Sequence, residues 1–449
     1  MKKKSGSSWK EESFKKKSDD SVTNKKTTRK KSSLAQNRKR FAFLIPFASL
    51  RLTITLLSLS MILIFVATLE QVRIGIRGAL AEYFESFFGV WYYPKQFWGG
   101  ELFHQIPLPI PGGYLLGGLL ILNLSAAYIL RFQWTGKKIG IQLIHLGIIL
   151  LLIGQLATQA MQEESRMQIN RGEKSDFIER FHGVELALRD VTDPAIEQVI
   201  TIPQELLKKG GLIYDPKLPF KLKIHHFGVN CDFDFAKKED DLSDISQIIT
   251  RGVGKTTKLN IVPKEEDFSN DALNFGYLAV ELIDENESLG TWLSISNPGG
   301  NMYWKMMYPQ LADLAFQSVR HNGKLWGITL RQTREYLPYS IELLDIKNEY
   351  YQGTETPFNF ESDINLHLEG NQTRRALVYM NTPLRHDGKT FYQYQMNDAA
   401  NYTVFQVIRN PSWLVPYIAC ILVSLGMLWQ FSFHLFRFLK KNSVQPKSA

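Results

Sequence analysis

Four long apolar stretches constrain this chain more than any other feature of its 449 residues. They cover residues 50–69, 114–132, 139–158 and 413–436, and each is close to the ~20 residues that a helix needs to cross a bilayer. The rest of the chain is polar and charged, so its near-zero mean hydropathy averages two unlike populations. The sequence therefore predicts an integral membrane protein with four transmembrane helices, and it excludes a soluble globular enzyme.

Basic residues set the expected orientation in the membrane. Residues 1–40 carry fifteen Lys or Arg against four acids, with almost no large apolar residues. We expect 1–45 to be a disordered cytosolic tail, in preference to an arm that binds nucleic acid. Further cations follow the second and fourth spans, and residues 438–449 form a second tail. All these cations fall on one side of a four-span plan, which the positive-inside bias makes cytosolic.

The same plan places two segments outside the cytosol. One is the loop 70–113, which follows a first span that we expect to be retained because no small-x-small cleavage site succeeds it. The other is the domain 161–410, between a three-helix region at 46–160 and the last span at 411–437. In a bacterium these segments would face away from the cytoplasm across the cytoplasmic membrane.

The loop 70–113 is dense in aromatic residues, which allows two interpretations. It could be an amphipathic segment in the membrane interface, where Trp and Tyr are enriched, or a platform facing a haem. The aromatic residues concerned are Phe87, Phe88, Trp91, Tyr92, Tyr93, Phe97, Trp98 and Phe103.

Apolar and polar residues alternate with a period of two through much of 161–410. Examples are 220–224, 277–283, 325–330, 339–344, 377–380 and 391–396, separated by Gly-Gly, Asn-Pro-Gly-Gly and Asp-Gly turn signals. This pattern predicts a large antiparallel β-rich domain, sandwich-like in its packing.

The outer domain shows no catalytic constellation. Residues 251–257 (RGVGKTT) look like a phosphate-binding loop but lack its first glycine, and no HExxH or GxSxG occurs. His225 and His226 are adjacent and would point to opposite faces of a strand, so they cannot share a metal. His182, His321, His367 and His386 are scattered, and we expect ordinary surface residues there. The only cysteines, Cys231 and Cys420, form no CxxC or CxxCH pair.

The third apolar stretch combines a glycine repeat with a histidine. Gly140, Gly147 and Gly154 recur every seven residues, so they form one stripe along a helix and let a neighbouring helix approach closely. Because few residues join the second and third spans, we expect these two spans to pack as an antiparallel hairpin.

His145 lies within this span, about 200° around the helix from Gly147 and on the same face as Gln142. It lies roughly 9 Å along the axis from residue 139, in the cytosolic half of the bilayer. An ionisable side chain at this depth is costly and marks function by default. The residues leave two alternatives: a hydrogen bond to another helix, or ligation of a metal or haem iron by the imidazole.

Several stretches together resemble the ResB (CcsB) family of System II cytochrome c biogenesis proteins. They are PIPGGYLLGGLLILNLSAAYILRF with GIQLIHLGIILLLIGQLAT, RMQINRGEKSDFI leading into VELALRD, YMNTPLRHDGKTFYQYQM, and IRNPSWLVPYIACILVSLGMLWQF. Their order and the four-span plan also agree with the family, and the resemblance covers about 45–440.

The resemblance implies a subunit that helps haem cross the membrane and be delivered to apocytochrome c for thioether attachment. The family has a haem-ligating histidine in the corresponding span, which matches His145. Haem would be bound transiently and shared with a ResC-like (CcsA) membrane protein. That partner would supply the tryptophan-rich motif missing here, and with it the second iron ligand. Other proteins would reduce the apocytochrome thiols, and whether this subunit makes bonds itself stays open between a non-catalytic and a co-catalytic role.

Four further residues have two interpretations each. Lys137, Lys138 and Arg131 could contact haem propionates, although the orientation signal explains them equally well. His434 could contact haem or extend from a membrane boundary to water. Two rival functions also stand beside the resemblance: a membrane-anchored β-domain scaffold without a cofactor, and a haem-dependent electron carrier. The carrier would need a second axial ligand, yet the first two spans contain no histidine.

Overall fold

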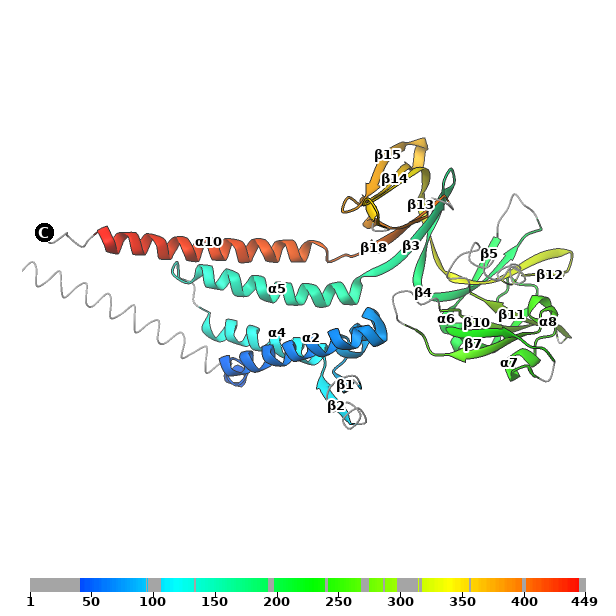
Figure 1. The fold of residues 1–449 in the computed structure, drawn as a ribbon, viewed down its shortest axis with the longest axis horizontal. Helices are drawn as coiled ribbons and strands as arrows, with labels where there is room; N and C mark the ends of the chain where they lie inside the picture. The colour runs from blue at the N-terminus through cyan, green and yellow to red at the C-terminus, as the bar shows by residue number, and fades with distance from the viewer. Residues whose placement is uncertain are drawn as a thin grey trace, which may run out of the picture. The chain divides into compact units, whose positions relative to one another are not determined.

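The computed structural model describes residues 41–93, 95, 106–132, 135–192, 198–238, 241–267, 274–285, 287–296, 314, 317–354, 357–397 and 401–443. The tail 1–40 and residues 444–449 lie outside these ranges. The chain divides into two units, Met1–Met161 with Pro411–Ala449, and Gln162–Asn410. The first unit is helical and the second is built from strands (Figure 1).

In the described residues, four helices are long and apolar enough to cross a membrane, which confirms the predicted spans. They are α2 (Leu50–Ala79), α4 (Gly113–Arg131), α5 (Ile139–Met161) and α10 (Leu414–Ser443). The first helix runs further than expected and bends at Gly75, whose φ of 73° suits a residue without a Cβ. A short π-helical turn, η2 (Leu80–Phe84), follows it.

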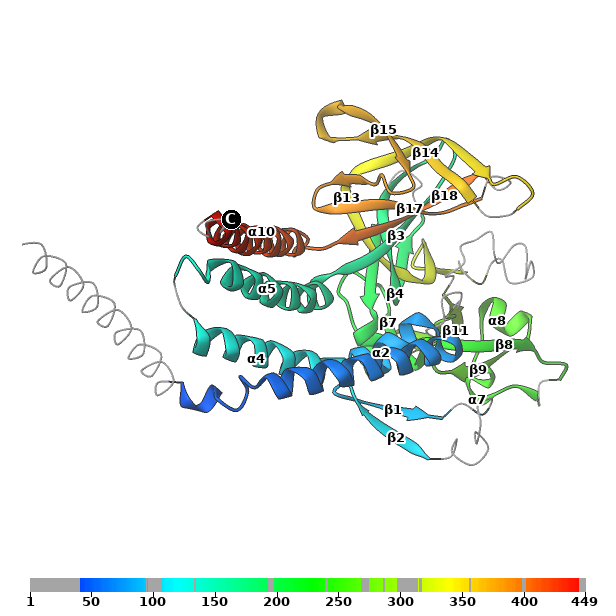
Figure 2. The same cartoon turned by 60° about the vertical axis from the view of Figure 1, so that its left-hand side comes forward.

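Asn123 joins α4 to the start of α2. Its side-chain nitrogen donates hydrogen bonds to the carbonyls of Phe47 and Ser49, and its oxygen accepts one from the Thr53 hydroxyl at 2.7 Å. This buried amide is therefore satisfied, as a polar group at membrane depth must be. In both ribbon views, α5 lies between α10 on one side and α4 on the other (Figures 1 and 2).

Part of the aromatic loop folds as a two-stranded antiparallel hairpin, β1 (Phe88–Tyr92) with β2 (Pro107–Pro111). Neither interpretation of the loop predicted this hairpin. Tyr83, which is fully buried, donates its hydroxyl to the Val90 carbonyl at 3.1 Å and so ties the hairpin to η2. Three of the aromatic residues, Phe97, Trp98 and Phe103, lie outside the described residues.

The second unit contains a ten-stranded and a four-stranded sheet, both antiparallel, which confirms the predicted β-rich fold. The large sheet has the order β15-β14-β13-β4-β3-β18-β17-β16, with β5 beside β4 and β12 beside β13. Its strands are β3 (Glu163–Asn170), β4 (Lys174–Asp190), β5 (Gln198–Pro203), β12 (Gln317–His321), β13 (Lys324–Tyr350), β14 (Pro357–His367), β15 (Thr373–Tyr379), β16 (Leu384–His386), β17 (Lys389–Asn397) and β18 (Tyr402–Arg409).

The smaller sheet has the order β11-β10-β7-β6. It comprises β6 (Gly211–Ile213), β7 (Lys221–Gly228), β10 (Tyr277–Asp284) and β11 (Glu287–Ile295), and a separate hairpin pairs β8 (Asn230–Phe235) with β9 (Leu259–Lys264). One core lies between the two sheets, with Leu186, Leu222, Val280 and Ile328 all fully buried in it. This half is the expected sandwich.

The other half of the large sheet curls around a second core that includes Ile341, Ile364 and Phe391. The strand path begins at β15 and ends at β16, yet these two strands are consecutive in the chain. Side chains rather than ladder bonds join β14 to β17 and β18 here. The Ser362 hydroxyl bonds to the Gln393 amide oxygen (2.7 Å) and to the Thr403 hydroxyl (3.0 Å).

Candidate functional site

His145 lies half-buried on α5, where its ring bonds to its own helix. The Nδ1 atom is 2.8 Å from the carbonyl oxygen of Ile141, one turn earlier. Because a carbonyl oxygen can only accept, this bond requires the proton on Nδ1, and a ring protonated there alone keeps its lone pair on Nε2. A backbone carbonyl on one ring nitrogen is the usual arrangement behind a histidine that ligates a metal through the other. In the described residues Nε2 has no hydrogen-bonding partner.

The glycine stripe of α5 faces α10. A Cβ built on Gly140 would lie 2.6 Å from the carbonyl oxygen of Gly426, and one built on Gly147 would lie 2.9 Å from that of Ala419. The second and third spans are neighbours, as expected, but the glycine stripe of α5 packs against α10 rather than α4 (Figures 1 and 2). Gly117, in α4, has open space around it instead. A short connection joins α4 to α5 in the chain. The glycines of α5, however, lie against the backbone of α10.

His145 consequently points away from the α10 seam. Gly147 faces α10, and a residue two positions earlier is turned by about 200° around the helix. Apolar neighbours flank the imidazole on this side, including Ile141 and Ile148, which are 40% and 38% exposed. Gln142 was expected to share this face, but it is buried, so only part of the face is open. A half-exposed imidazole in an apolar surround suits a porphyrin or a neighbouring helix.

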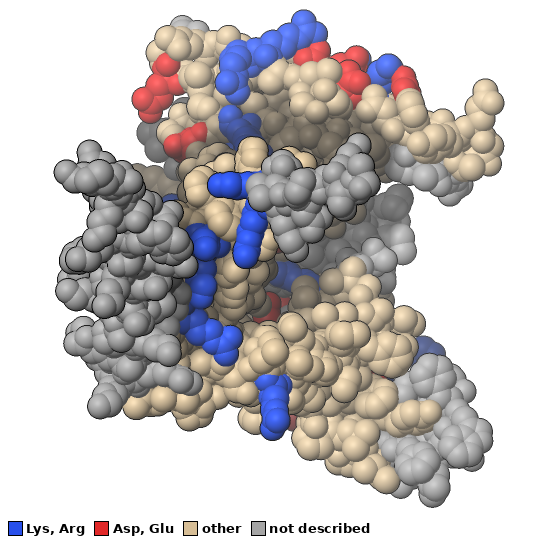
Figure 3. Space-filling model, turned by 90° about the vertical axis from the view of Figure 1, so that its left-hand side faces the viewer, with Lys and Arg blue, Asp and Glu red and all other residues tan. Residues whose placement is uncertain are grey.

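Cations cluster at the end of the bundle where α5 begins. Lys137 and Lys138 are exposed there, and Arg131 donates to the Ala48 carbonyl at 3.0 Å while its side chain stays exposed. Figure 3 looks onto this end of the helices and shows a run of Lys and Arg side chains across it. The three spanning segments 41–69, 113–161 and 411–440 contain no Asp or Glu. His145 lies seven residues beyond Lys138, or ~10 Å along the helix axis.

His434, the other histidine of the helical unit's spans, has a different environment. Its Nε2 atom is 2.8 Å from the side-chain nitrogen of Gln430, one turn earlier, and the ring is exposed. The nitrogen that would bind iron is therefore engaged within α10. In the described residues no group of three His, Cys, Asp or Glu side chains is arranged to hold a metal ion.

A polar cleft of about 540 Å³ lies on the curled half of the outer domain. The turn after β15 forms one wall, and β16, β17 and β18 form the rest. Six of the residues that line it are Tyr379, Asn381, Arg385, Tyr392, Gln393 and Gln406. Sequence reasoning did not single out this cleft, although most of its lining comes from the stretch 379–396 that carries the family resemblance.

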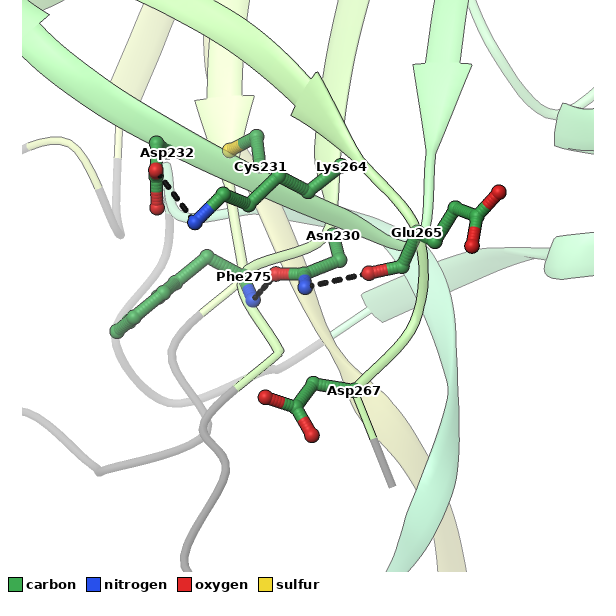
Figure 4. A pocket seen from close by; sticks show the side chains of 7 residues that line it. All are labelled: Asn230, Cys231, Asp232, Lys264, Glu265, Asp267 and Phe275. Carbon is green, nitrogen blue, oxygen red and sulfur yellow. Dashed lines mark hydrogen bonds and ion pairs between the residues drawn. The ribbon is translucent and has the colours of Figure 1, made fainter. Parts of the chain in front are cut away.

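A second cavity, of about 330 Å³, lies beside the β8–β9 hairpin (Figure 4). Its polar groups are largely paired with one another: Asn230 accepts from the Phe275 amide and donates to the Glu265 carbonyl, and Lys264 pairs with Asp232 at 2.5 Å. Burial raises the pKa of the Cys231 thiol to about 12, so it stays protonated. These contacts stabilise the hairpin, so the polar groups named are engaged with one another rather than arranged to bind or react with a ligand.

The outer histidines are not all surface residues. The side chain of His321 is 11% exposed and lies against Phe220, with Nε2 3.1 Å from an Asp284 oxygen, so the surface prediction was wrong for it. His225 and His367 each contact a carboxylate, Glu281 and Glu342, at 2.8 Å. The segment 251–257 contains only the short helix α8 (Gly252–Thr256), in keeping with its rejection as a phosphate loop.

Taken together, the helices and sheets define a polytopic membrane protein with a large antiparallel β domain and one half-buried histidine inside a span. The family model of the ResB-like family matches residues 321–401, from the end of β12 past the end of β17. This match supports the resemblance to the ResB family over the matched part of the outer domain. It includes the stretch YMNTPLRHDGKTFYQYQM, whereas the other three stretches lie outside it. No curated protein matches the chain.

Proposed function

We propose that this chain is the ResB-like subunit of a System II cytochrome c synthetase. In this role it helps haem cross the membrane and be delivered to apocytochrome c for thioether attachment. The family match and the four apolar helices support the proposal. We infer a bacterial cytoplasmic membrane, with both termini cytosolic and Gln162–Asn410 on the far side, from the cations at one end of the bundle.

The main observation in support of the proposal is the hydrogen bonding of His145. Its Nδ1 proton is committed to the Ile141 carbonyl, so Nε2 is available to iron. Haem is the cargo here and is held only in passing. A ResC-like partner would supply the second ligand and the tryptophan-rich surface. Lys137 and Lys138, exposed near the start of α5, would attract the propionates before the iron reaches His145.

Thioether formation also needs a step that we do not attribute to this chain, the reduction of the apocytochrome thiols. A cysteine thiol adds across a haem vinyl group, so an S–H bond breaks while S–C and C–H bonds form. This addition needs reduced thiols. Cys231 is buried and protonated, Cys420 lies within α10, and the sequence contains no CxxC motif that would form a reducing pair. We therefore expect separate thiol-reducing proteins, and a carrying role for this subunit.

The test is the haem spectrum of the complex with a ResC-like partner. Wild type and His434→Ala should show a Soret band of equal strength, and His145→Ala should lose most of it together with cytochrome c maturation. Equal haem content in wild type and His145→Ala would overturn the assignment of the ligand. A wild-type complex without haem, supporting maturation all the same, would favour the cofactor-free scaffold.

A further inference from the structure

Strand β15 ends the large sheet and leaves one side of its backbone without a strand. Among the described strands it pairs only with β14, from Glu361 opposite Tyr379 to His367 opposite Thr373. After Tyr379 the chain turns away, with reciprocal backbone bonds between Tyr379 and Thr382 of 3.3 and 2.9 Å. This bridge uses the backbone groups of Tyr379, so the amide donors and acceptors open to an added strand are those of the second edge from Thr373 to Leu377.

The side chains along this edge alternate as they do in a strand that has one covered and one open face. Val378 is buried in the core, whereas Leu377 and Tyr379 on either side of it are 44% and 39% exposed. Exposed apolar side chains two residues apart are suited to pack against alternate side chains of a neighbouring strand. Arg374 and Arg375 are also exposed, which disfavours a second copy of this basic strand as the neighbour.

The edge leads directly into the 540 Å³ cleft, because Tyr379 belongs to both. The lining of the cleft includes one arginine and no carboxylate. Asn381 carries a side-chain amide there, which can donate to a peptide carbonyl and accept from a peptide N–H, whereas the Gln406 amide donates to Glu164 at 3.4 Å. Tyr392, half-buried on β17, adds an aromatic surface at the far wall. Such a lining recognises main chain more than any particular side chain.

From these observations we infer that the β15 edge and the adjoining cleft bind a polypeptide in an extended conformation by strand addition. The inference rests on the proposed function, in which an unfolded apocytochrome is the protein substrate. Recognition through the main chain suits that substrate class, since different apocytochromes share an extended backbone rather than a sequence. The cleft would then hold the peptide while haem is presented to it.

The probe is a fluorescein-labelled synthetic peptide with no net charge and a Ser-X-X-Ser-His sequence, roughly 12 residues long, enough for β15 and the cleft at ~3.3 Å per residue. Its binding to the full chain in lipid nanodiscs is measured by fluorescence anisotropy. Tyr392→Ala should raise Kd about tenfold, the effect expected of an aromatic hot spot. The matched control Tyr214→Ala removes a ring that is 67% exposed outside the cleft and should leave Kd unchanged.

A second measurement needs no variant. The same peptide N-methylated at alternate residues cannot form ladder hydrogen bonds and should not bind wild type, whereas a peptide of scrambled order should bind as well as the original. Equal binding of the methylated peptide, or an unchanged Kd for Tyr392→Ala, would overturn the inference. Haem content separates the two proposals: failure of peptide binding with haem retained removes only this site, and peptide binding without haem removes only the haem role.

Discussion

Gly140 of α5 and Gly426 of α10 lie against each other's backbones. A Cβ on Gly140 would be 2.6 Å from the Gly426 carbonyl oxygen, and a Cβ on Gly426 would be 2.7 Å from the Gly140 carbonyl oxygen. No real Cβ tolerates such contacts with backbone, so the two helices can approach this closely only with glycine at both positions. Close approach maximises the van der Waals contact that joins helices in lipid, where the hydrophobic effect does not operate between them.

The first prediction concerns this seam. Gly140→Ala should destabilise the helical unit by about 1–3 kcal/mol, because the methyl group must push α10 away. Unfolding in mixed detergent micelles, followed by tryptophan fluorescence, would measure it. Gly117→Ala is the control, since a Cβ there meets nothing within 4 Å, and alanine should be neutral or slightly stabilising in its helix. Equal effects of the two substitutions would contradict the assignment of the seam.

The second prediction separates a ligand from a packing residue. The only hydrogen bond of the His145 ring in the described residues is to Ile141 within the same helix. His145→Ala should therefore change the stability of the protein alone by no more than ~0.5 kcal/mol, as for substitutions away from packed or networked sites. Thermal unfolding in the absence of haem is the measurement. If His145→Ala lost several kcal/mol of unfolding free energy, the imidazole would be a packing residue of the helical unit. Reduced haem binding by this variant would then follow from misfolding.

The spans were predictable because length and apolar composition suffice to define a membrane helix, and these are local properties. The partner of the glycine stripe was not. A repeat of seven residues marks a contact face on α5 but does not identify the helix that packs against it, whereas the short loop correctly indicated that α4 lies beside α5 (Figure 1). The position of His145 relative to the stripe follows from helix geometry, and the segment is helical as that inference requires.

In the outer domain, too, local patterns predicted the elements but not how they are joined and packed. Period-two alternation revealed the strands, yet the predicted strands at 325–330 and 339–344 are both parts of the single strand β13. Pro338 and the irregular register near Tyr336 break the alternation between them. The strand continues because β4 pairs with it on both sides of that break. The cleft at Tyr379 is lined mostly by the turn after β15 and by β16 and β17, whose residues are close in the sequence, but alternation alone does not show that they enclose a cleft.

The third prediction tests how the curled half of the sheet is closed. Thr403 is fully buried and bonds to Ser362 and to the Gln393 side chain. Thr403→Val keeps the shape but leaves two buried polar groups with fewer partners, so it should cost about 1–3 kcal/mol in urea unfolding. Thr390→Val on the neighbouring strand is the control, because the Thr390 side chain has no such network and is only half-buried. A neutral Thr403→Val would show that this side-chain network contributes little to closing the curled half.

The fourth prediction is a dependence of stability on pH. A side-chain hydrogen bond from Ser288, and a second from His225, lower the pKa of Glu281 below its usual value. Since the folded pKa is the lower one, the stabilisation is fully present above the unfolded pKa of about 4.3 and is lost as the pH falls through the folded pKa. Urea midpoints should therefore decrease from about pH 4.3 downward. Ser288→Ala removes the largest cause, so the decrease should become shallower; an unchanged slope would exclude this carboxylate as its source.

The last prediction uses the Cys231 thiol as a reporter of the outer domain. Cys231 is 2% exposed, and burial raises its pKa to about 12, so almost no thiolate forms at neutral pH. In folded protein a maleimide should leave Cys231 unlabelled, and the Cys420→Ser variant removes the other thiol, which lies in the membrane-spanning helix α10. In the Cys420→Ser variant, labelling should appear only as urea unfolds the outer domain, with the same midpoint as the tryptophan signal. Rapid labelling of that variant under native conditions would mean that the β8–β9 hairpin opens locally, and the cavity beside it would then be accessible.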